Sequence, residues 1–182
     1  LLVFGKRAGE YAAKFAQENE GAEIDDTEVD ALAKAALEPL ERDGDGENPY
    51  EIQRELQEMM QDKVGIIRED GLMREAIDDI AKLAERAPKA AAPGNREYNP
   101  GWHTALDLKC LLTVSEASAR AALERQESRG AQTRNDFPDK DPDDWGRHNL
   151  LLRKGNDGSM EVEKVSVVPQ NDQQKKIIKD NQ

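Results

Sequence analysis

Residues 127–138 read Glu-Ser-Arg-Gly-Ala-Gln-Thr-Arg-Asn-Asp-Phe-Pro, and this stretch follows the longest helical pattern of the chain. Arg129 and Arg134 flank a glycine, and an Asp-Phe-Pro turn closes the segment. Arginine presents a planar fork of N–H donors that suits carboxylates and the free carbonyl groups at a helix end. Two interpretations stand side by side: the pair caps the preceding helix, or it fastens this domain to another domain or subunit.

Upstream of this stretch, apolar residues recur at helical spacing, which predicts a mainly α fold. We expect about five helices arranged like a three-helix bundle, at residues 1–19, 27–42, 49–64, 69–87 and 101–127. Asn48 is predicted to cap the third helix, with Pro49 at its first position. The expected inner faces of the second to fourth helices are Val29, Leu32, Ala36 and Leu40; Ile52, Leu56, Met59 and Met60; and Leu72, Ala76, Ile80, Leu83 and Ala87.

The fifth helix is apolar on two faces, which is typical of a central helix. One face carries Leu108, Leu112 and Ala119, and the other carries Val114, Ala117 and Ala121. The Pro- and Gly-containing linker 88–100 is expected to be mobile around residues 90–94.

The sequence divides into residues 1–135, a helical bundle, and residues 136–182, a small irregular and β extension. The extension begins with an Asp/Pro-rich loop, residues 136–144. Two short strands, 148–152 and 161–168, are then expected around the turn 155–158. Residues 170–182 form a charged tail that is expected to fray.

The chain is acidic, with Lys+Arg 26 against Asp+Glu 38 and a net charge of −12. Binding to nucleic acid or to an anionic membrane needs clustered positive charge, so these partners are disfavoured. No run of 18 apolar residues is present, so no segment is predicted to span a bilayer. Cys110 is the single cysteine, which excludes an internal disulfide and is compatible with a reducing compartment.

The alternating acids Asp43, Asp45 and Glu47 resemble a calcium loop only superficially. Such a loop needs Gly at its sixth position and Glu at its twelfth, but Asn48 and Arg54 stand there. We therefore expect a solvated loop.

The other reactive side chains do not form a catalytic pattern. His103 and His148 are the only histidines, and neither has a Cys or a second His at metal-ligand spacing. His103 is expected to be structural and Cys110 to be a small core residue. The sequence contains no Gly-rich phosphate loop, so no catalytic, cofactor-binding or metal-binding residue is predicted.

The first helix carries an apolar stripe and two glycines, Gly5 and Gly9. Glycine in a helix interior costs roughly 1 kcal/mol relative to alanine, so these two suggest that another backbone approaches closely. The segment Leu1–Phe4 is apolar on every side. We expect it to be covered by an upstream domain, and to promote self-association when that domain is missing.

Five segments together resemble one family, the flavoprotein subunits of succinate dehydrogenase and fumarate reductase in respiratory complex II. They occur in the family's order, at residues 1–9, 56–72, 98–127, 127–138 and 141–150. The last reads Asp-Pro-Asp-Asp-Trp-Gly-Arg-His-Asn-Leu. One position departs from the family pattern: the usual His after Arg-Gly-Ala is Gln132 here, which keeps hydrogen bonding but cannot carry a positive charge.

The resemblance implies the C-terminal domain of an enzyme that interconverts succinate and fumarate by hydride transfer at FAD. FAD would be bound by an upstream domain, with Leu1 and Leu2 only adjacent to the expected flavin contact. Electrons would pass to an iron–sulfur subunit and a quinone, and a membrane anchor would be reached only through that subunit. The interface or structural candidates are Gly5, Gly9, Arg129, Gln132, Arg134, Trp145 and His148.

This resemblance also implies a location and leaves alternatives open. The parent would lie peripherally on the cytoplasmic face of a bacterial inner membrane, or on the matrix side in a mitochondrion. L-aspartate oxidase and adenylylsulfate reductase carry similar helical domains, although the loop 141–150 favours complex II. A free-standing helical adaptor is an alternative from a different class. The physiological direction, the quinone and the mode of FAD attachment are not encoded in this segment.

Overall fold

The structure is a computed structural model that describes residues 1–42 and 46–180. Its helices are α1 (Leu2–Glu18), α2 (Asp26–Glu41), α3 (Pro49–Val64), α4 (Asp70–Arg86), α5 (Pro100–Glu124) and α6 (Asp172–Asp180), with short 3-10 turns η1 (Ala87–Lys89) and η2 (Trp145–Arg147). Its strands are β1 (Ile67–Arg68), β2 (Thr133–Arg134), β3 (His148–Lys154) and β4 (Met160–Ser166). Asp43 and Asp45 of the expected solvated loop lie outside the described residues.

The chain forms two compact units, residues 1–37 and 38–182. In the first unit, α1 buries none of its side chains. A Cβ built on Gly5 or Gly9 meets no atom of the described chain within 4 Å, so the expected close approach of another backbone stays a prediction. The predicted stripe of α2 is wrong at Val29 and Leu32, which are exposed, whereas Leu40 at its other end is buried.

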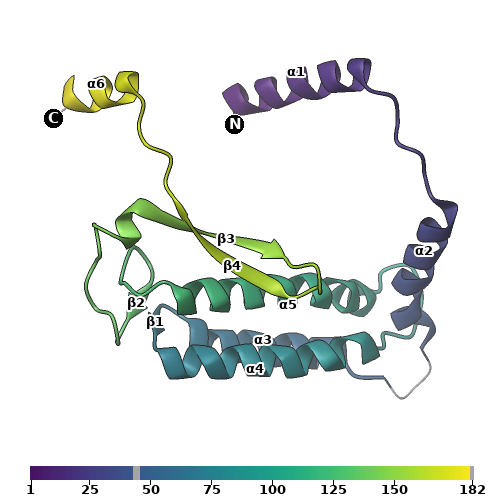
Figure 1. The fold of residues 1–182 in the computed structure, drawn as a ribbon. Coiled ribbons are helices and arrows are strands. Elements are labelled where there is room, and N and C mark those ends of the chain that lie inside the picture. The colour runs from purple at the N-terminus through teal and green to yellow at the C-terminus, as the bar shows by residue number, and fades with distance from the viewer. Residues whose placement is uncertain (43–45, 181–182) are drawn as a thin grey trace. The chain divides into compact units, whose positions relative to one another are not determined.

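The second unit is built around α3, α4 and α5, which lie side by side and pack against one another in pairs (Figure 1). Its core consists of buried aliphatic side chains from all three helices and of Ala90 from the linker before α5: Ile52, Leu56, Val64, Ala76, Ile80, Leu83, Ala90, Ala105, Leu108, Leu112 and Ala119. The prediction of a mainly α, bundle-like fold with a small β extension is confirmed.

Two helices of the bundle begin with the same local device, an asparagine cap followed by proline. The Asn48 side chain accepts a hydrogen bond from Tyr50 N at 3.0 Å, as the sequence predicted. The Asn99 side chain accepts from Trp102 N at 3.0 Å. In each case the cap satisfies a backbone donor that the helix itself leaves without a partner.

The buried face of α4 differs from the prediction by one residue. Met73 is fully buried, whereas Leu72 is 39% exposed. Met73, Ala76, Ile80 and Leu83 follow spacings of three, four and three, which place them on one face. Leu72 lies about 100° around the helix from Met73, and Ala87, also predicted to be buried, is half-buried in η1.

The linker before α5 is anchored, so the expectation of mobility is wrong for Ala90 and Ala92, which are both buried. Ala91 N donates to Glu47 O at 2.9 Å, and Ala92 N donates to Pro39 O at 2.8 Å. The small alanine side chains can be buried against the bundle here. The backbone hydrogen bonds hold in place a segment whose composition suggested flexibility.

The C-terminal extension contains the predicted hairpin. β3 and β4 pair antiparallel from His148 opposite Ser166 to Lys154 opposite Met160, and the turn between them holds Gly158 at a φ of +84°. The hairpin runs along α5 (Figure 1) and contacts it through both strands. The tail, expected to fray, forms α6 with no buried residue. No helix in the described part of the chain has the length and apolarity required to cross a bilayer.

Candidate functional site at the end of the long helix

The C-terminal end of α5 is closed by the buried side chain of Arg134. Its Nη1 donates to the carbonyls of Ala122, Leu123 and Arg125 at 2.8, 3.0 and 3.1 Å. Its Nε and Nη2 donate to the two oxygens of Asp136 at 2.7 and 2.6 Å, and this pairing lowers the pKa of Asp136. The capping interpretation therefore holds for Arg134. The same bonds end α5 at Glu124, three residues before the predicted end.

Gln132, the residue before β2, reaches the same helix end. Its Nε2 donates to Arg125 O at 3.1 Å and to Ala122 O at 3.4 Å. Its Oε1 accepts from Arg68 Nη1 at 2.9 Å. Arg68 in turn closes the end of α3, because its Nε donates to Gly65 O at 2.6 Å and to Val64 O at 3.2 Å.

The backbone reinforces this junction through the parallel pair β1–β2. Ile67 lies opposite Thr133 and Arg68 opposite Arg134, with Thr133 N donating to Ile66 O at 3.0 Å and Asn135 N to Arg68 O at 2.9 Å. Segments more than 60 residues apart in sequence are thereby held together.

A tight turn aims Arg129 away from the helix end. Arg129 and Gln132 exchange two backbone hydrogen bonds, of 2.9 and 3.1 Å, and Gly130 between them has a φ of +61°. That conformation is open to glycine and strained for most other residues, which explains the Arg-Gly-Ala sequence. Arg129 consequently does not cap α5, so the capping interpretation is wrong for this arginine.

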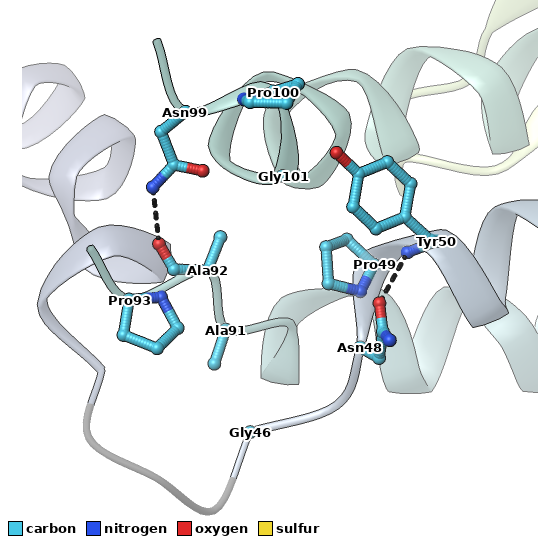
Figure 2. A pocket seen from close by; sticks show the side chains of 10 residues that line it. All are labelled: Gly46, Asn48, Pro49, Tyr50, Ala91, Ala92, Pro93, Asn99, Pro100 and Gly101. Atoms are coloured by element: carbon cyan, nitrogen blue, oxygen red, sulfur yellow. Dashed lines mark hydrogen bonds between the residues drawn. The ribbon is translucent and has the colours of Figure 1, made fainter. Parts of the chain in front are cut away.

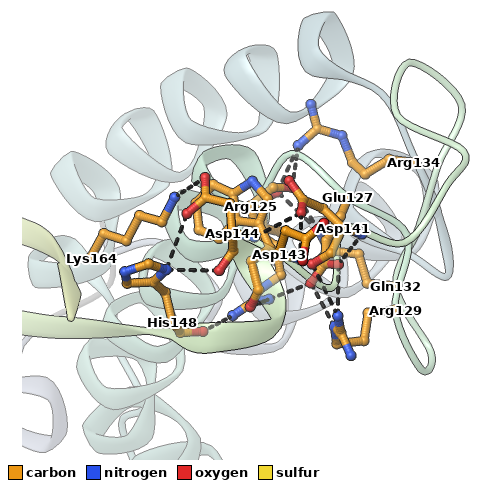
Figure 3. Close-up of polar contacts among 12 residues, drawn as sticks. Arg125, Glu127, Arg129, Gln132, Arg134, Asp141, Asp143, Asp144, His148 and Lys164 are labelled. Atoms are coloured by element: carbon orange, nitrogen blue, oxygen red, sulfur yellow. Dashed lines mark hydrogen bonds and ion pairs between the residues drawn. The ribbon is translucent and has the colours of Figure 1, made fainter. Parts of the chain in front are cut away.

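Arg129 instead pairs with Glu127, whose carboxylate is fully buried (Figure 3). Arg129 Nε and Nη2 donate to Oε1 and Oε2 at 2.6 and 3.0 Å. Arg125 Nη1 donates to Oε1 at 2.5 Å, and Asp141 N donates to Oε2 at 2.8 Å. The Arg129 guanidinium, followed by the Asp141 N–H and Arg125, lowers the pKa of Glu127 from 4.5 to about 2, against the opposing effect of burial.

Trp145 and His148 join the hairpin to this cluster. The buried Trp145 ring has Arg125 Cζ at 5.2 Å and Lys164 Nζ at 3.8 Å from its centroid, distances at which cations are attracted to the ring face. Lys164 also pairs with Asp144 at 2.6 Å. His148 Nδ1 lies 2.7 Å from Asp144 O, and His148 O accepts from Arg125 Nη2 at 3.0 Å.

The sequence-predicted candidates thus separate into two groups. Arg129, Gln132, Arg134, Trp145 and His148 meet at one end of the bundle, whereas Gly5 and Gly9 belong to the other compact unit. Further members were missed, among them Arg68, Arg125, Glu127, Asp136, Asp144 and Lys164. The alternation Arg125-x-Glu127-x-Arg129 was a usable signal for two of them, Arg125 and Glu127. The sequence instead placed Glu127 at the end of the predicted helix 101–127, where a carboxylate exposed to solvent is common.

A pocket of about 450 Å³ lies at the other end of the bundle, where α3 and α5 begin (Figure 2). Asparagine, proline, glycine, alanine and Tyr50 line it, and its lining includes no basic side chain. The pocket therefore offers the two phosphates of FAD no basic side chain. Within residues 1–42 and 46–180, no group of three or more His, Cys, Asp or Glu side chains is placed to hold a metal ion.

Comparison with known proteins places this arrangement in a class, the C-terminal helical domains of FAD-dependent oxidoreductases. The family model described as fumarate reductase flavoprotein C-term matches residues 53–177, from within α3 to within α6. The chain therefore belongs to this family of succinate dehydrogenase and fumarate reductase flavoproteins.

Individual relatives agree with the family model. The fumarate reductase flavoprotein subunit of Haemophilus influenzae is 35% identical over 160 residues, which are 86% of this chain and 26% of the relative. The succinate dehydrogenase flavoprotein subunit of Coxiella burnetii is 34% identical over 159 residues, 85% of this chain and 27% of the relative. The chain thus spans about a quarter of the length of these relatives.

A solved structure shows the same fold at similar sequence identity. The Sdh1 complex of Mycobacterium smegmatis in its apo form superposes with a TM-score of 0.80 and 39% identity, covering 91% of this chain and 28% of that chain. Relatives named for succinate oxidation and for fumarate reduction both match, so sequence similarity does not separate the two directions.

Proposed function

We propose that this chain is the C-terminal structural domain of a flavoprotein subunit that interconverts succinate and fumarate. In the full-length protein, upstream domains would bind FAD and the dicarboxylate, and electrons would leave for an iron–sulfur subunit. The residues described here would supply no reacting group. They would hold the flavin-binding part in position relative to the electron acceptor, a role that requires rigidity and matching surfaces.

The observation that carries the proposal is that the polar side chains of residues 125–136 form hydrogen bonds and ion pairs with other groups of this domain. Arg134 is directed to carbonyls of α5 and to Asp136. Both oxygens of Glu127 are occupied by arginines and a backbone N–H. Groups held in this way stabilise a junction between helices, and they are not free to bind and release a substrate.

Partners and location follow from the same proposal. Relatives solved as the Sdh1 complex and as quinol–fumarate reductase with menaquinol support assembly with further subunits, which we propose to be an iron–sulfur subunit and, through it, a membrane anchor. The subunit would then lie peripherally on the cytoplasmic face of a bacterial inner membrane, or on the matrix side of a mitochondrial one. We also propose that the chain divides into a helical bundle, residues 1–135, and a small extension, residues 136–182.

In the full-length protein, an upstream domain would cover the side chains of Leu1–Phe4, which are exposed here, and would prevent self-association.

The test is purification of the full-length protein from its native source. We expect an iron–sulfur subunit to co-purify and succinate to reduce an artificial dye. Release of hydrogen peroxide from L-aspartate, by a protein that purifies without such a partner, would move the assignment to L-aspartate oxidase. A native polypeptide whose N-terminus lies near residue 1 and that binds no flavin would favour the free-standing adaptor.

A further inference from the structure

The amide of Gln132 connects two helix ends that no other single side chain connects among the described residues. Arg68 is anchored on the carbonyls that end α3, and it donates to Gln132 Oε1. Gln132 Nε2 donates to the carbonyls that end α5. Arginine can only donate and carbonyls can only accept, so the amide has one orientation that satisfies both sides.

The charges around Gln132 restrict what can stand at this position. The charged side chains on the elements that meet here include Arg68 on β1, Arg134 on β2, Asp136 after it, Asp70 at the start of α4, Glu124 and Arg125 at the end of α5, and Lys63 in the last turn of α3, which pairs with Glu75 and Asp79 of α4. Asp136 is bound through both oxygens to Arg134, Arg125 pairs with Glu127, and Asp70 pairs with Arg74. Arg68 has no carboxylate partner in the described part of the chain, and burial and Arg134 lower its pKa.

Each charged alternative at position 132 breaks one side of the connection. A cation would lie beside Arg68 and Arg134 and would offer Arg68 no acceptor. A carboxylate would accept from Arg68, but it would face the carbonyls of α5, where the helix dipole is negative. Only a neutral side chain that both donates and accepts satisfies the site.

We propose that Gln132 is a neutral link between the ends of α3 and α5, and that its lack of a titratable group makes the α3–α5 junction insensitive to pH near neutrality. Histidine is the informative replacement, because neutral imidazole donates through one nitrogen and accepts through the other. Protonated imidazole has two donors and no acceptor. The Gln132→His variant should therefore keep the link at high pH and lose it at low pH.

The sign of this dependence follows from the surroundings. Burial and two neighbouring arginines disfavour imidazolium, so the pKa of a histidine at position 132 would be depressed in the folded state. Protons would then favour the opened junction, and the loss would begin as pH falls below about 6.5, the value for a free histidine. Each unit of depression corresponds to about a tenfold change in the opening equilibrium.

The experiment is native-state hydrogen exchange of the full-length protein, followed at residues 122–125 and 133–135 at pH 8 and pH 5.5. Relative to wild type at the same pH, Gln132→His should exchange at a similar rate at pH 8 and faster at pH 5.5, by up to about tenfold, because pH 5.5 lies one unit below the pKa of about 6.5 of a free histidine. Gln132→Leu should exchange faster at both pH values. Gln126→His, at an exposed position of the same loop, is the matched control and should match wild type throughout.

Equal exchange in wild type and Gln132→Leu would overturn the proposal, as would a Gln132→His variant with no additional change at pH 5.5. A double-mutant cycle of Arg68→Met and Gln132→Leu gives a second, pH-independent test. The change in the free energy of opening in the double variant should be smaller than the sum of the changes in the two single variants, because each substitution breaks the same bond. Full additivity would mean that the two residues act independently, and would reject the link.

Discussion

At the scale of single residues, Glu127 determines the character of the cluster. An isolated buried carboxylate would cost several kcal/mol, but here Oε1 receives Arg125 and Arg129, and Oε2 receives Arg129 and Asp141 N. One side chain thereby joins the segment after α5, the turn at Gly130 and the acidic loop. Arg125 and Arg129 together compensate the charge of this buried carboxylate.

Replacing Glu127 by Gln should destabilise this region strongly. The substitution leaves two arginines without their anion, and breaking a buried pair costs roughly 3 kcal/mol. Hydrogen exchange at residues 139–144 of the full-length protein reports the loss locally. Glu163→Gln, which removes only an exposed pair with Arg153 at 3.4 Å, should have little effect. Similar exchange in both variants would contradict the assigned role of Glu127.

The same carboxylate predicts a pH dependence. Its pKa is depressed to about 2 in the folded state from an ordinary 4.5, so its contribution is complete above about pH 4.5 and is lost as pH falls toward 2. The difference in exchange at residues 139–144 between wild type and Glu127→Gln should therefore shrink across that window. A difference that stays constant between pH 5 and pH 3 would be inconsistent with a charged Glu127.

At the scale of elements, the decisive feature is how α5 ends. Ala122, Leu123 and Arg125 all present carbonyls to one guanidinium, and β1–β2 holds that guanidinium's strand against the end of α3. The sequence could predict where helices begin, because Asn48 and Pro49 act within one turn. It could not predict where α5 ends, because the groups that end it are 7 to 12 residues away from the carbonyls they bind and depend on the turn at Gly130.

Replacing Arg134 by Lys should loosen the last turn of α5, although charge is conserved. Lysine has no fork to bind Asp136 through two nitrogens while reaching three carbonyls. We expect a cost of about 3 kcal/mol, comparable to breaking a buried pair, which corresponds to roughly a hundredfold faster exchange at residues 122–125. Arg120→Lys, in a partly exposed pair with Glu116, is the control. Wild-type protection in Arg134→Lys would show that charge alone closes the helix.

At the scale of the whole molecule, the fold class was predictable and the assembly of the cluster was not. Helical periodicity is local, so the bundle and the hairpin could be inferred from short windows of sequence. The error at Leu72 and Met73 of α4 concerns which of two adjacent apolar residues faces inward. The pairing of Arg68 with Gln132 spans 64 residues, and no local pattern encodes a contact of that kind.

The central claim is that this domain organises a flavoenzyme and takes no part in its chemistry. Arg129 offers the most direct test, because it is the partly exposed arginine of the motif and a natural candidate for a catalytic group. The measurement is turnover per bound flavin, flavin content and co-purified iron–sulfur subunit for Arg129→Gln in the full-length protein, with the exposed Arg153→Gln as control. We predict unchanged turnover per flavin together with reduced flavin content or subunit assembly. Normal flavin content and assembly with greatly reduced turnover would contradict the claim and make Arg129 a catalytic residue.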